Sequence, residues 1–261
     1  MMPAGDSTAE GPAKPSRSGG SRSFILTYHS LDESGSPISV PPAVFQRQME
    51  FLSGCGMPVV PLGGIRNRPG AVAITFDDGF DNFLTGALPA LQKFRLPATV
   101  FAVSGYCGRR NDWPTQAPGI PILPLMDWAA LRELSRQGIE IGAHTIHHPR
   151  LTHLSAGEME REVSGCQKEI EDRIGKPVRS FAYPYGDSNA ETRQIASRHF
   201  DAACGVRLGY LESASGPFDL PRLDAYYLRE PFWFERLGTP AGWTYIWARR
   251  QLRWVRAALL R

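Results

Sequence analysis

Two short segments hold the carboxylates and imidazoles that could bind a metal ion in this 261-residue chain. Asp77 and Asp78 precede Gly79 in the first segment, and His144 and His148 stand four residues apart in the second. Two imidazoles and one carboxylate leave coordination positions open for water, as a catalytic zinc or iron site requires. The second carboxylate can stay off the metal and accept a proton from that water. These residue types predict a metal-dependent hydrolase.

Each segment follows an apolar run that predicts a buried strand. The first run spans residues 71–76 and breaks at Gly79, and the second spans residues 139–143. Side chains at strand ends, presented by loops, are where α/β enzymes place their chemistry. We therefore expect the reacting groups in loops that follow strands.

Strands and helices alternate along the rest of the chain. Further strands are predicted at residues 23–28, 97–103, 178–183 and 201–206, and helices near residues 45–54, 82–94, 127–137, 156–174 and 189–200. This alternation indicates an α/β chain with a mostly parallel barrel or open sheet. Residues 1–22 are rich in Gly, Ser, Pro and Ala, which predicts a disordered tail. A loop over residues 105–125 is long enough to be a lid or a wall of a binding site.

Composition excludes several classes of protein. The formal net charge of +3 is too small to argue for nucleic acid. The four cysteines form no C-x-x-C pair, which favours reduced thiols over a disulfide framework or a structural zinc site. The sequence shows neither a transmembrane span nor the basic-then-apolar pattern of a secretory signal, and at face value it predicts a cytoplasmic protein.

Taken in order, the motifs resemble those of the polysaccharide deacetylases of the NodB-homology type, carbohydrate esterase family 4. The resemblance covers about Phe24 to Tyr227 and rests on three matches, Thr75–Gly79, His144–Pro149 and Phe181–Gly186. The opening Leu26–Ser30 is similar to the start of a bacterial subgroup associated with exopolysaccharide modification. The family fold, a distorted (β/α)7 barrel, agrees with the alternation of strands and helices. Residues 23–228 would be its catalytic domain.

The resemblance implies a role for each motif residue. Asp78, His144 and His148 would bind one divalent ion, and Asp77 would be the general base that deprotonates water. The two histidines are expected on one side of a helical turn, from which both can reach one ion. Zinc is the first choice for these ligands, and iron or cobalt would also fit. The backbone N–H of Tyr185 would join the metal in stabilising a tetrahedral oxyanion.

Two departures from the commoner family pattern affect this assignment. Many members carry an arginine where this chain has Ala182, and Arg222 is the candidate substitute that would pair with the catalytic aspartate. The common pattern also uses a late histidine as general acid, but no histidine follows His199. His29 is the free candidate, because in the subgroup that begins with Tyr-His the N-terminal strand can take the place of the missing late one. We predict that His29 donates a proton to the leaving amine.

Aromatic residues near the motifs are candidates for binding a sugar. Sugar rings stack on aromatic faces, so Tyr183, Tyr185, Trp113 and Trp128 could line a groove. Simple packing is the alternative for each of them. Tyr185 is the strongest candidate because it adjoins the site.

The C-terminal segment, residues 229–261, is predicted to be an amphipathic helical extension. Between Thr244 and Leu259, apolar and aromatic residues are interleaved with arginines. A helix docked on the barrel is the default interpretation. The alternative is peripheral membrane contact, with a basic aromatic helix lying on an anionic membrane surface.

The reaction expected from these residues is hydrolysis of an N-acetyl group from an amino sugar, with release of acetate and a free amine. The partner would be an acetylated amino-sugar polymer or a lipid-linked saccharide. Hydrolysis of a small non-sugar C–N bond or of an O-acetyl ester could use the same site. A carbohydrate-binding protein without turnover is the alternative from another class, because neither the supporting arginine nor the acid lies where the common pattern puts it.

Overall fold

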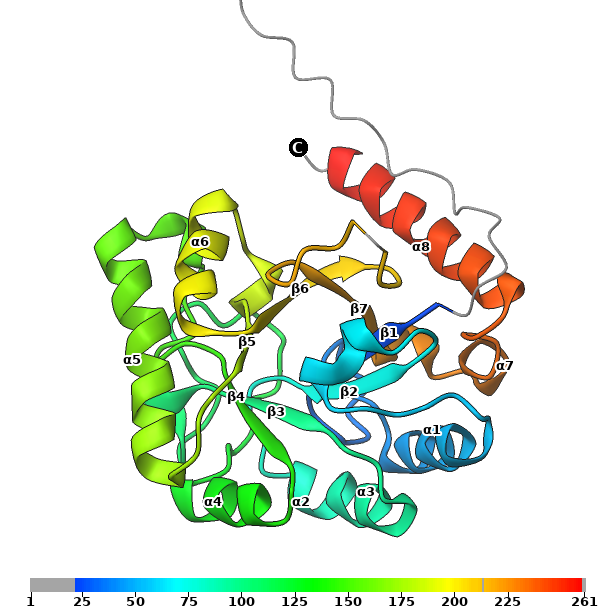
Figure 1. The fold of residues 1–261 in the computed structure, drawn as a ribbon, viewed down its shortest axis with the longest axis horizontal. Coiled ribbons are helices and arrows are strands. Elements are labelled where there is room, and N and C mark those ends of the chain that lie inside the picture. Colours follow the sequence, from blue (N-terminus) through cyan, green and yellow to red (C-terminus); the bar gives the residue numbers. More distant parts are fainter. Residues whose placement is uncertain (1–21, 213, 260–261) are drawn as a thin grey trace, which may run out of the picture.

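The computed structural model describes residues 22–212 and 214–259, so the predicted tail over residues 1–22 lies outside the described part except for its last residue. Seven parallel strands close into a barrel in sequence order, with the first strand beside the last (Figure 1). The strands are β1 (Phe24–Tyr28), β2 (Val72–Phe76), β3 (Thr99–Ala102), β4 (Glu140–Ala143), β5 (Ser180–Ala182), β6 (Ala202–Leu208) and β7 (Leu220–Asp224). This arrangement confirms the distorted (β/α)7 barrel predicted from the sequence.

Helices lie around the outside of the barrel (Figure 1). They are α1 (Pro42–Gly54), α2 (Phe83–Gly86), α3 (Leu88–Phe94), α4 (Trp128–Arg136), α5 (Ala156–Ile174) and α6 (Ala190–His199). The prediction of one helix over residues 82–94 is wrong, because the helix is interrupted at Ala87, between α2 and α3. Pro89 explains the break, since it has no N–H to continue the hydrogen-bond ladder of α2. A capping box formed by Ser155 and Glu158 begins α5.

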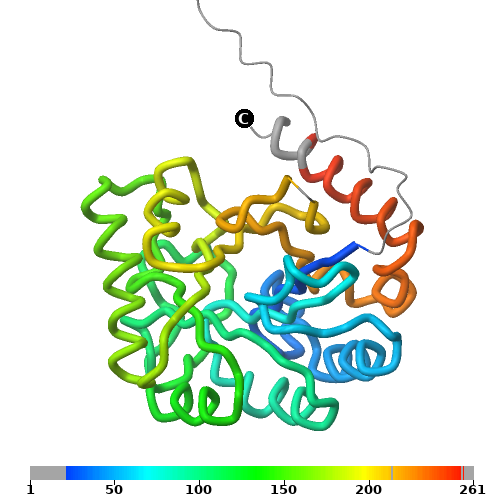
Figure 2. Tube along the Cα trace, viewed as in Figure 1, coloured from blue at the N-terminus to red at the C-terminus, as the bar shows by residue number. Residues whose placement is uncertain are grey.

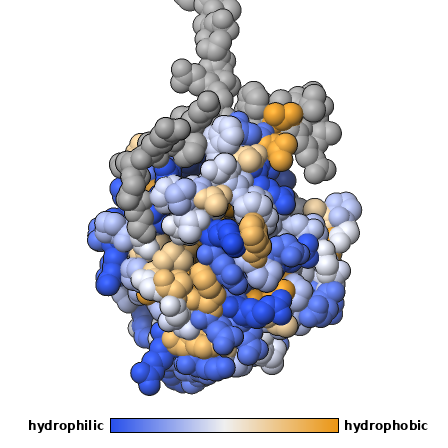
Figure 3. Space-filling model, turned by 90° about the vertical axis from the view of Figure 1, so that its right-hand side faces the viewer, coloured by the Kyte–Doolittle hydropathy of each residue, from blue (hydrophilic) through white to orange (hydrophobic). Residues whose placement is uncertain are grey.

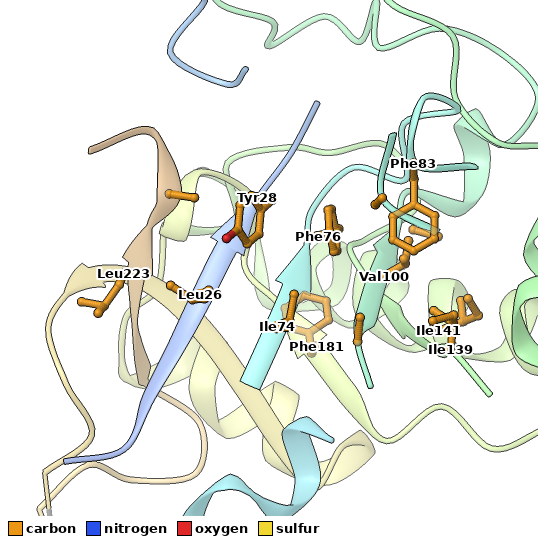
Figure 4. Packing of buried hydrophobic residues seen from close by; sticks show 14 of the residues in the cluster. Leu26, Tyr28, Ile74, Phe76, Phe83, Val100, Ile139, Ile141, Phe181 and Leu223 are labelled. Carbon is orange, nitrogen blue, oxygen red and sulfur yellow. The ribbon is translucent and has the colours of Figure 1, made fainter. Parts of the chain in front are cut away.

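Side chains of each strand alternate between the helix layer and the barrel interior. On β2, Ile74 and Phe76 pack outward against the helices, as Figure 4 shows in the core cluster. Ala73 belongs instead to the interior cluster, and Thr75 and Asp77 continue its face of the strand. Because side chains alternate along a strand, Asp77 faces the barrel interior at the point where β2 ends and its loop begins.

An aromatic ring fills the barrel interior below that end. The ring of Phe101 on β3 faces Gly142 on β4, where a Cβ would lie only 2.5 Å from its Cδ1 atom. The glycine is required because no side chain fits between this ring and the backbone of the neighbouring strand. Ser180 restricts the same space from β5, with its Oγ 2.7 Å from the position of that Cβ.

Two further helices, α7 (Pro231–Phe234) and α8 (Pro240–Leu259), follow the barrel. The ring of Trp233 stacks on Tyr245 with centroids 4.1 Å apart, which joins the two helices. Figure 2 shows α8 beside the start of β1, where the guanidinium of Arg22 lies 4.8 Å from the ring of Trp243. Among the described residues, no helix combines the length and the hydropathy that crossing a membrane requires.

Candidate metal centre and active site

Three side chains from two loops converge at the C-terminal end of the barrel strands. Asp78 follows β2, and His144 and His148 follow β4. The Nε2 atoms of both histidines lie 3.4 Å from Oδ1 of Asp78, and the three potential ligand atoms lie within 4.8 Å of one another. All three residues are buried. The geometry brings together the three ligands predicted from the sequence.

The donor set fits a divalent cation. Within the described residues, Oδ1 of Asp78 is buried without a hydrogen-bond partner, although it faces two imidazole nitrogens. Nδ1 of His144 lies 2.7 Å from the carbonyl oxygen of Ala182. When Nδ1 donates its N–H to this oxygen, the lone pair of His144 is on Nε2, the atom that faces Asp78. Burial alone would raise the pKa of Asp78, but the two imidazoles hold it well below its usual value. The carboxylate is therefore ionised, as a metal ligand must be.

Left-handed backbone shapes the site at four non-glycine residues. The φ angles are positive at Asp78 (70°), Thr145 (68°), His148 (57°) and Tyr185 (59°). The helical turn predicted for the two histidines is therefore wrong, since the segment between them is a loop. Such conformations are costly for residues with a Cβ and persist only where surrounding contacts impose them.

Glu162 of α5 supplies the contacts that hold this loop. Its Oε2 accepts hydrogen bonds from the backbone N–H groups of Ile146 and His147, both at 2.9 Å. Its Oε1 lies 2.7 Å from Nδ1 of His147. Inside the loop, the hydroxyl of Thr145 accepts a hydrogen bond from the N–H of His148 at 3.0 Å. Sequence reasoning missed Glu162 because a glutamate on an amphipathic helix carries no distinguishing signal.

Asp77, next to the candidate ligand Asp78, is paired with Arg222 of β7. The guanidinium donates to both carboxylate oxygens of Asp77 at 2.7 Å, and both side chains are almost completely buried. Burial alone would raise the pKa of Asp77, but the charge and the hydrogen bonds of Arg222 hold it below its usual value. The structure thus places Arg222 where the sequence analysis put the substitute for the arginine absent at Ala182.

His29 stands at the end of β1 on the same side of the barrel. Its Nε2 lies 3.8 Å from Oδ2 of Asp77, and a quarter of its side chain remains exposed. Asn82 fastens the residues that follow His29, because its amide donates to the hydroxyl of Ser30 at 2.7 Å and its Oδ1 accepts the N–H of Leu31 at 3.2 Å. This imidazole is partly exposed beside a buried carboxylate, so a bound molecule could contact both groups.

The loop predicted as a lid or wall lies against His148. The ring centroid of Trp113 is 4.1 Å from that of His148, and the centroid of Tyr185 is 4.6 Å away. The hydroxyl of Thr115 donates to the carbonyl oxygen of His148 at 2.8 Å, and the phenol oxygen of Tyr185 lies 2.9 Å from that same hydroxyl. These contacts hold the His148 imidazole between two aromatic rings.

Three of the four aromatic residues predicted to bind sugar do not face a groove. Tyr183 is 1% exposed and its hydroxyl donates to the carbonyl of Phe218, so it is a packing residue. Trp113 is also buried, beneath His148. Trp128 packs near Arg173 at the C-terminal end of α5, far from the half of that helix that carries Glu162. Only Tyr185 borders the site with part of its ring accessible.

Comparison with known proteins identifies the family to which this chain belongs. The model of the polysaccharide deacetylase family matches residues 64–200, so the chain belongs to this family, whose members are hydrolases. The Bacillus subtilis protein YxkH, which carries the name of a polysaccharide deacetylase, is 26% identical over 182 residues. A Staphylococcus aureus poly-beta-1,6-N-acetyl-D-glucosamine N-deacetylase is 23% identical over 167 residues. These alignments cover 67% and 60% of this chain but only 60% and 52% of the two relatives.

A solved structure supports the fold independently. The structure of IcaB from Ammonifex degensii superposes with a TM-score of 0.68 at 21% identity, covering 89% of this chain and 98% of that one. At this identity the likeness concerns the barrel alone. The chain is thus a member of the NodB-homology polysaccharide deacetylases, in agreement with the resemblance seen in its motifs.

Proposed function

We propose that this chain hydrolyses N-acetyl groups of amino sugars in a polysaccharide or a lipid-linked saccharide, with one divalent metal ion held by Asp78, His144 and His148. The observation that carries the proposal is the position of the Asp77–Arg222 pair beside those three ligands. An ionised carboxylate next to a cation site, but hydrogen-bonded to a guanidinium, has the position and charge of a general base.

The metal, when bound, would activate water and polarise the acetyl carbonyl. Asp77 takes one proton from the attacking water, and Arg222 keeps its carboxylate ionised and oriented for this transfer. The carbonyl carbon gains a C–O bond, and its oxygen becomes an oxyanion that the backbone N–H of Tyr185 would stabilise. The position of Tyr185 supports this role, because its ring centroid lies 4.6 Å from that of the proposed metal ligand His148.

His29 would complete the reaction as general acid. It gives a proton to the sugar nitrogen while the C–N bond breaks, so that water and the acetamide become acetate and a free amine. Its place 3.8 Å from Asp77 supports this assignment, because both groups can then contact one acetamide from neighbouring strands. Zinc is our first choice for the ion, with iron or cobalt as alternatives.

The choice of an amino-sugar polymer draws on a relative. The Staphylococcus aureus protein is named as a deacetylase of poly-beta-1,6-N-acetyl-D-glucosamine, and oligomers of this sugar are therefore the first substrate to test. Tyr185 is positioned to contact such a sugar, because its ring is partly accessible and lies beside the ligand His148. The guanidinium of Arg150 lies 4.5 Å above the Tyr185 ring and limits where a sugar could stack.

Acetate release from these oligomers tests the proposal, measured after chelation and after addition of Zn²⁺, Fe²⁺ or Co²⁺. We expect activity only with metal, and a fall in kcat of about 10²–10⁴-fold for both Asp77→Asn and His29→Ala. His153→Ala, which changes an exposed histidine without a place in the site, is the matched control.

Each outcome addresses a separate part of the proposal. Glycan binding without acetate release would favour a carbohydrate-binding protein that does not turn over. Near-wild-type kcat in His29→Ala would remove the assignment of the acid but leave the metal centre standing. Equal activity before and after complete chelation would refute the metal-dependent reaction.

A further inference from the structure

Positive charge is concentrated at the C-terminal end of the chain. From Arg236 to Arg261 the sequence contains six arginines and neither aspartate nor glutamate. These 26 residues therefore carry a formal charge of +6, whereas the rest of the chain carries −3 and the whole chain +3. Because the positive charge is concentrated in this segment, the segment is suited to bind an anionic surface even though the net charge of the whole chain is small.

One side of α8 packs against the barrel and the opposite side does not. Ile246 is buried, and Trp243 lies under the guanidinium of Arg22. At 3.6 residues per turn, Leu252 points away from Trp243, and it is 68% exposed. Val255, one turn later on α8, is 45% exposed. The helix thus covers the barrel with one face and leaves an apolar strip on the other.

Exposed large apolar side chains gather in this part of the molecule. Five are found among the described residues, and three of them, Phe232, Leu252 and Val255, belong to α7 and α8. Figure 3 shows the side of the molecule on which these helices lie, with hydrophobic patches interrupting a hydrophilic surface. Single exposed apolar residues are ordinary, but three of the five on two joined helices are a local concentration.

Arginines flank the apolar strip on α8. The guanidinium groups of Arg249 and Arg253 lie 5.0 and 5.8 Å from the ring centroid of Tyr227. Nε of Arg249 also donates to the hydroxyl of Tyr245 at 3.0 Å. These contacts hold the guanidinium groups against aromatic rings, with Arg249 half-buried and Arg253 exposed at the surface. A helix with apolar residues bordered by arginines matches the headgroup region of an anionic membrane.

We propose that α7 and α8 dock on an anionic phospholipid surface through a basic face, defined here as Phe232, Arg249, Leu252, Arg253 and Val255. The apolar side chains enter the headgroup boundary, and the arginines contact lipid phosphates. The proposal concerns binding alone and stands independently of the reaction assigned to the barrel.

The basic face adjoins the candidate active site. Burial raises the pKa of Asp224 at the end of β7, and the charges of His29 and Arg253 both oppose that shift. The guanidinium groups of Arg249 and Arg253 lie over the ring of Tyr227, which follows β7 by three residues, so the basic face borders the end of the strand that carries Arg222.

Vesicle sedimentation of the full chain tests the proposal. We expect binding to vesicles of phosphatidylcholine with phosphatidylglycerol, none to phosphatidylcholine alone, and release as salt increases. Neutralisation in Arg253→Gln should weaken binding about fivefold, and Leu252→Glu should weaken it further. The matched controls are Arg136→Gln and Ile122→Glu, which change an exposed arginine and an exposed apolar residue outside the basic face and should bind as the unaltered chain does.

Several results would overturn the proposal. They are equal binding to neutral and anionic vesicles, no binding to either, or equal losses in Leu252→Glu and Ile122→Glu. Concentration-dependent dimerisation that Leu252→Glu abolishes would instead assign the basic face to a second copy of the chain. Leu252 is mostly exposed, so its substitution leaves the fold intact, and unchanged far-UV circular dichroism verifies this.

Discussion

Replacing Arg222 with methionine should destabilise the barrel strongly, because it leaves a buried negative charge without its partner. The guanidinium makes two 2.7 Å hydrogen bonds to Asp77 and a third, at 2.8 Å, to the carbonyl of Gly205. Removal of one member of a buried ion pair costs about 3–5 kcal/mol. In a chain of this size each kcal/mol lowers Tm by about 2–4 °C, so the expected fall is roughly 6–20 °C.

The assay is urea or thermal unfolding followed by circular dichroism, in the presence of a chelator so that no cation replaces the lost charge. Asp77→Asn removes the buried charge, and the double variant Asp77→Asn/Arg222→Met should recover most of the stability that Arg222→Met loses. The control is Arg179→Met, which breaks a 3.1 Å ion pair with Asp201 at the surface and should cost about 0–1 kcal/mol. A loss in Arg222→Met no larger than in the control, or no recovery in the double variant, would refute the reasoning.

Three further predictions concern the barrel interior, the ligand loop and the thiols. Gly142→Ala should lower the free energy of unfolding by about 1–3 kcal/mol, because its Cβ would press on Phe101, and an unchanged urea midpoint would contradict this. Glu162→Ala should weaken metal affinity about 10–100-fold in a competition titration, because the N–H groups of Ile146 and His147 lose the carboxylate that accepts them. Equal affinity would show that the loop keeps its conformation without Glu162. Burial raises the pKa of Cys166 and Cys204 to about 12. Alkylation near neutral pH, followed by mass spectrometry, should therefore label these two thiols only after unfolding. Rapid labelling of the folded chain would contradict this prediction.

The strand-borne part of the site could be predicted from the sequence because it follows simple periodicity. Apolar runs identified the strands, and alternation along β2 carries Asp77 to the inner face at the strand end. The pairing partner of Asp77 could be proposed because Arg222 lies in a short extended run, and the barrel brings that run beside β1. The alternation of side chains along each strand and the closure of the barrel together bring Asp77 and Arg222 into contact.

The loop-borne part could not be predicted in the same way. Positive φ at Thr145 and His148 has no signature in residue type, so the spacing of the histidines suggested a helical turn that does not form. The clamp from Glu162 depends on how α5 packs on the loop, which is tertiary information. The burial of Tyr183 was equally invisible, because an aromatic residue beside a motif fits both a groove wall and a core.

The pairing of the first strand with the last has a consequence for the order in which the molecule gains its properties during synthesis. The proposed ligands Asp78, His144 and His148 all leave the ribosome before β7 does. Until that strand arrives, Asp77 has no counterion, and His29 sits on an unpaired edge of an open sheet. The proposed proton-transfer groups are therefore completed only when the barrel closes, and a chain ending before residue 220 would hold the three proposed ligands without the Asp77–Arg222 pair.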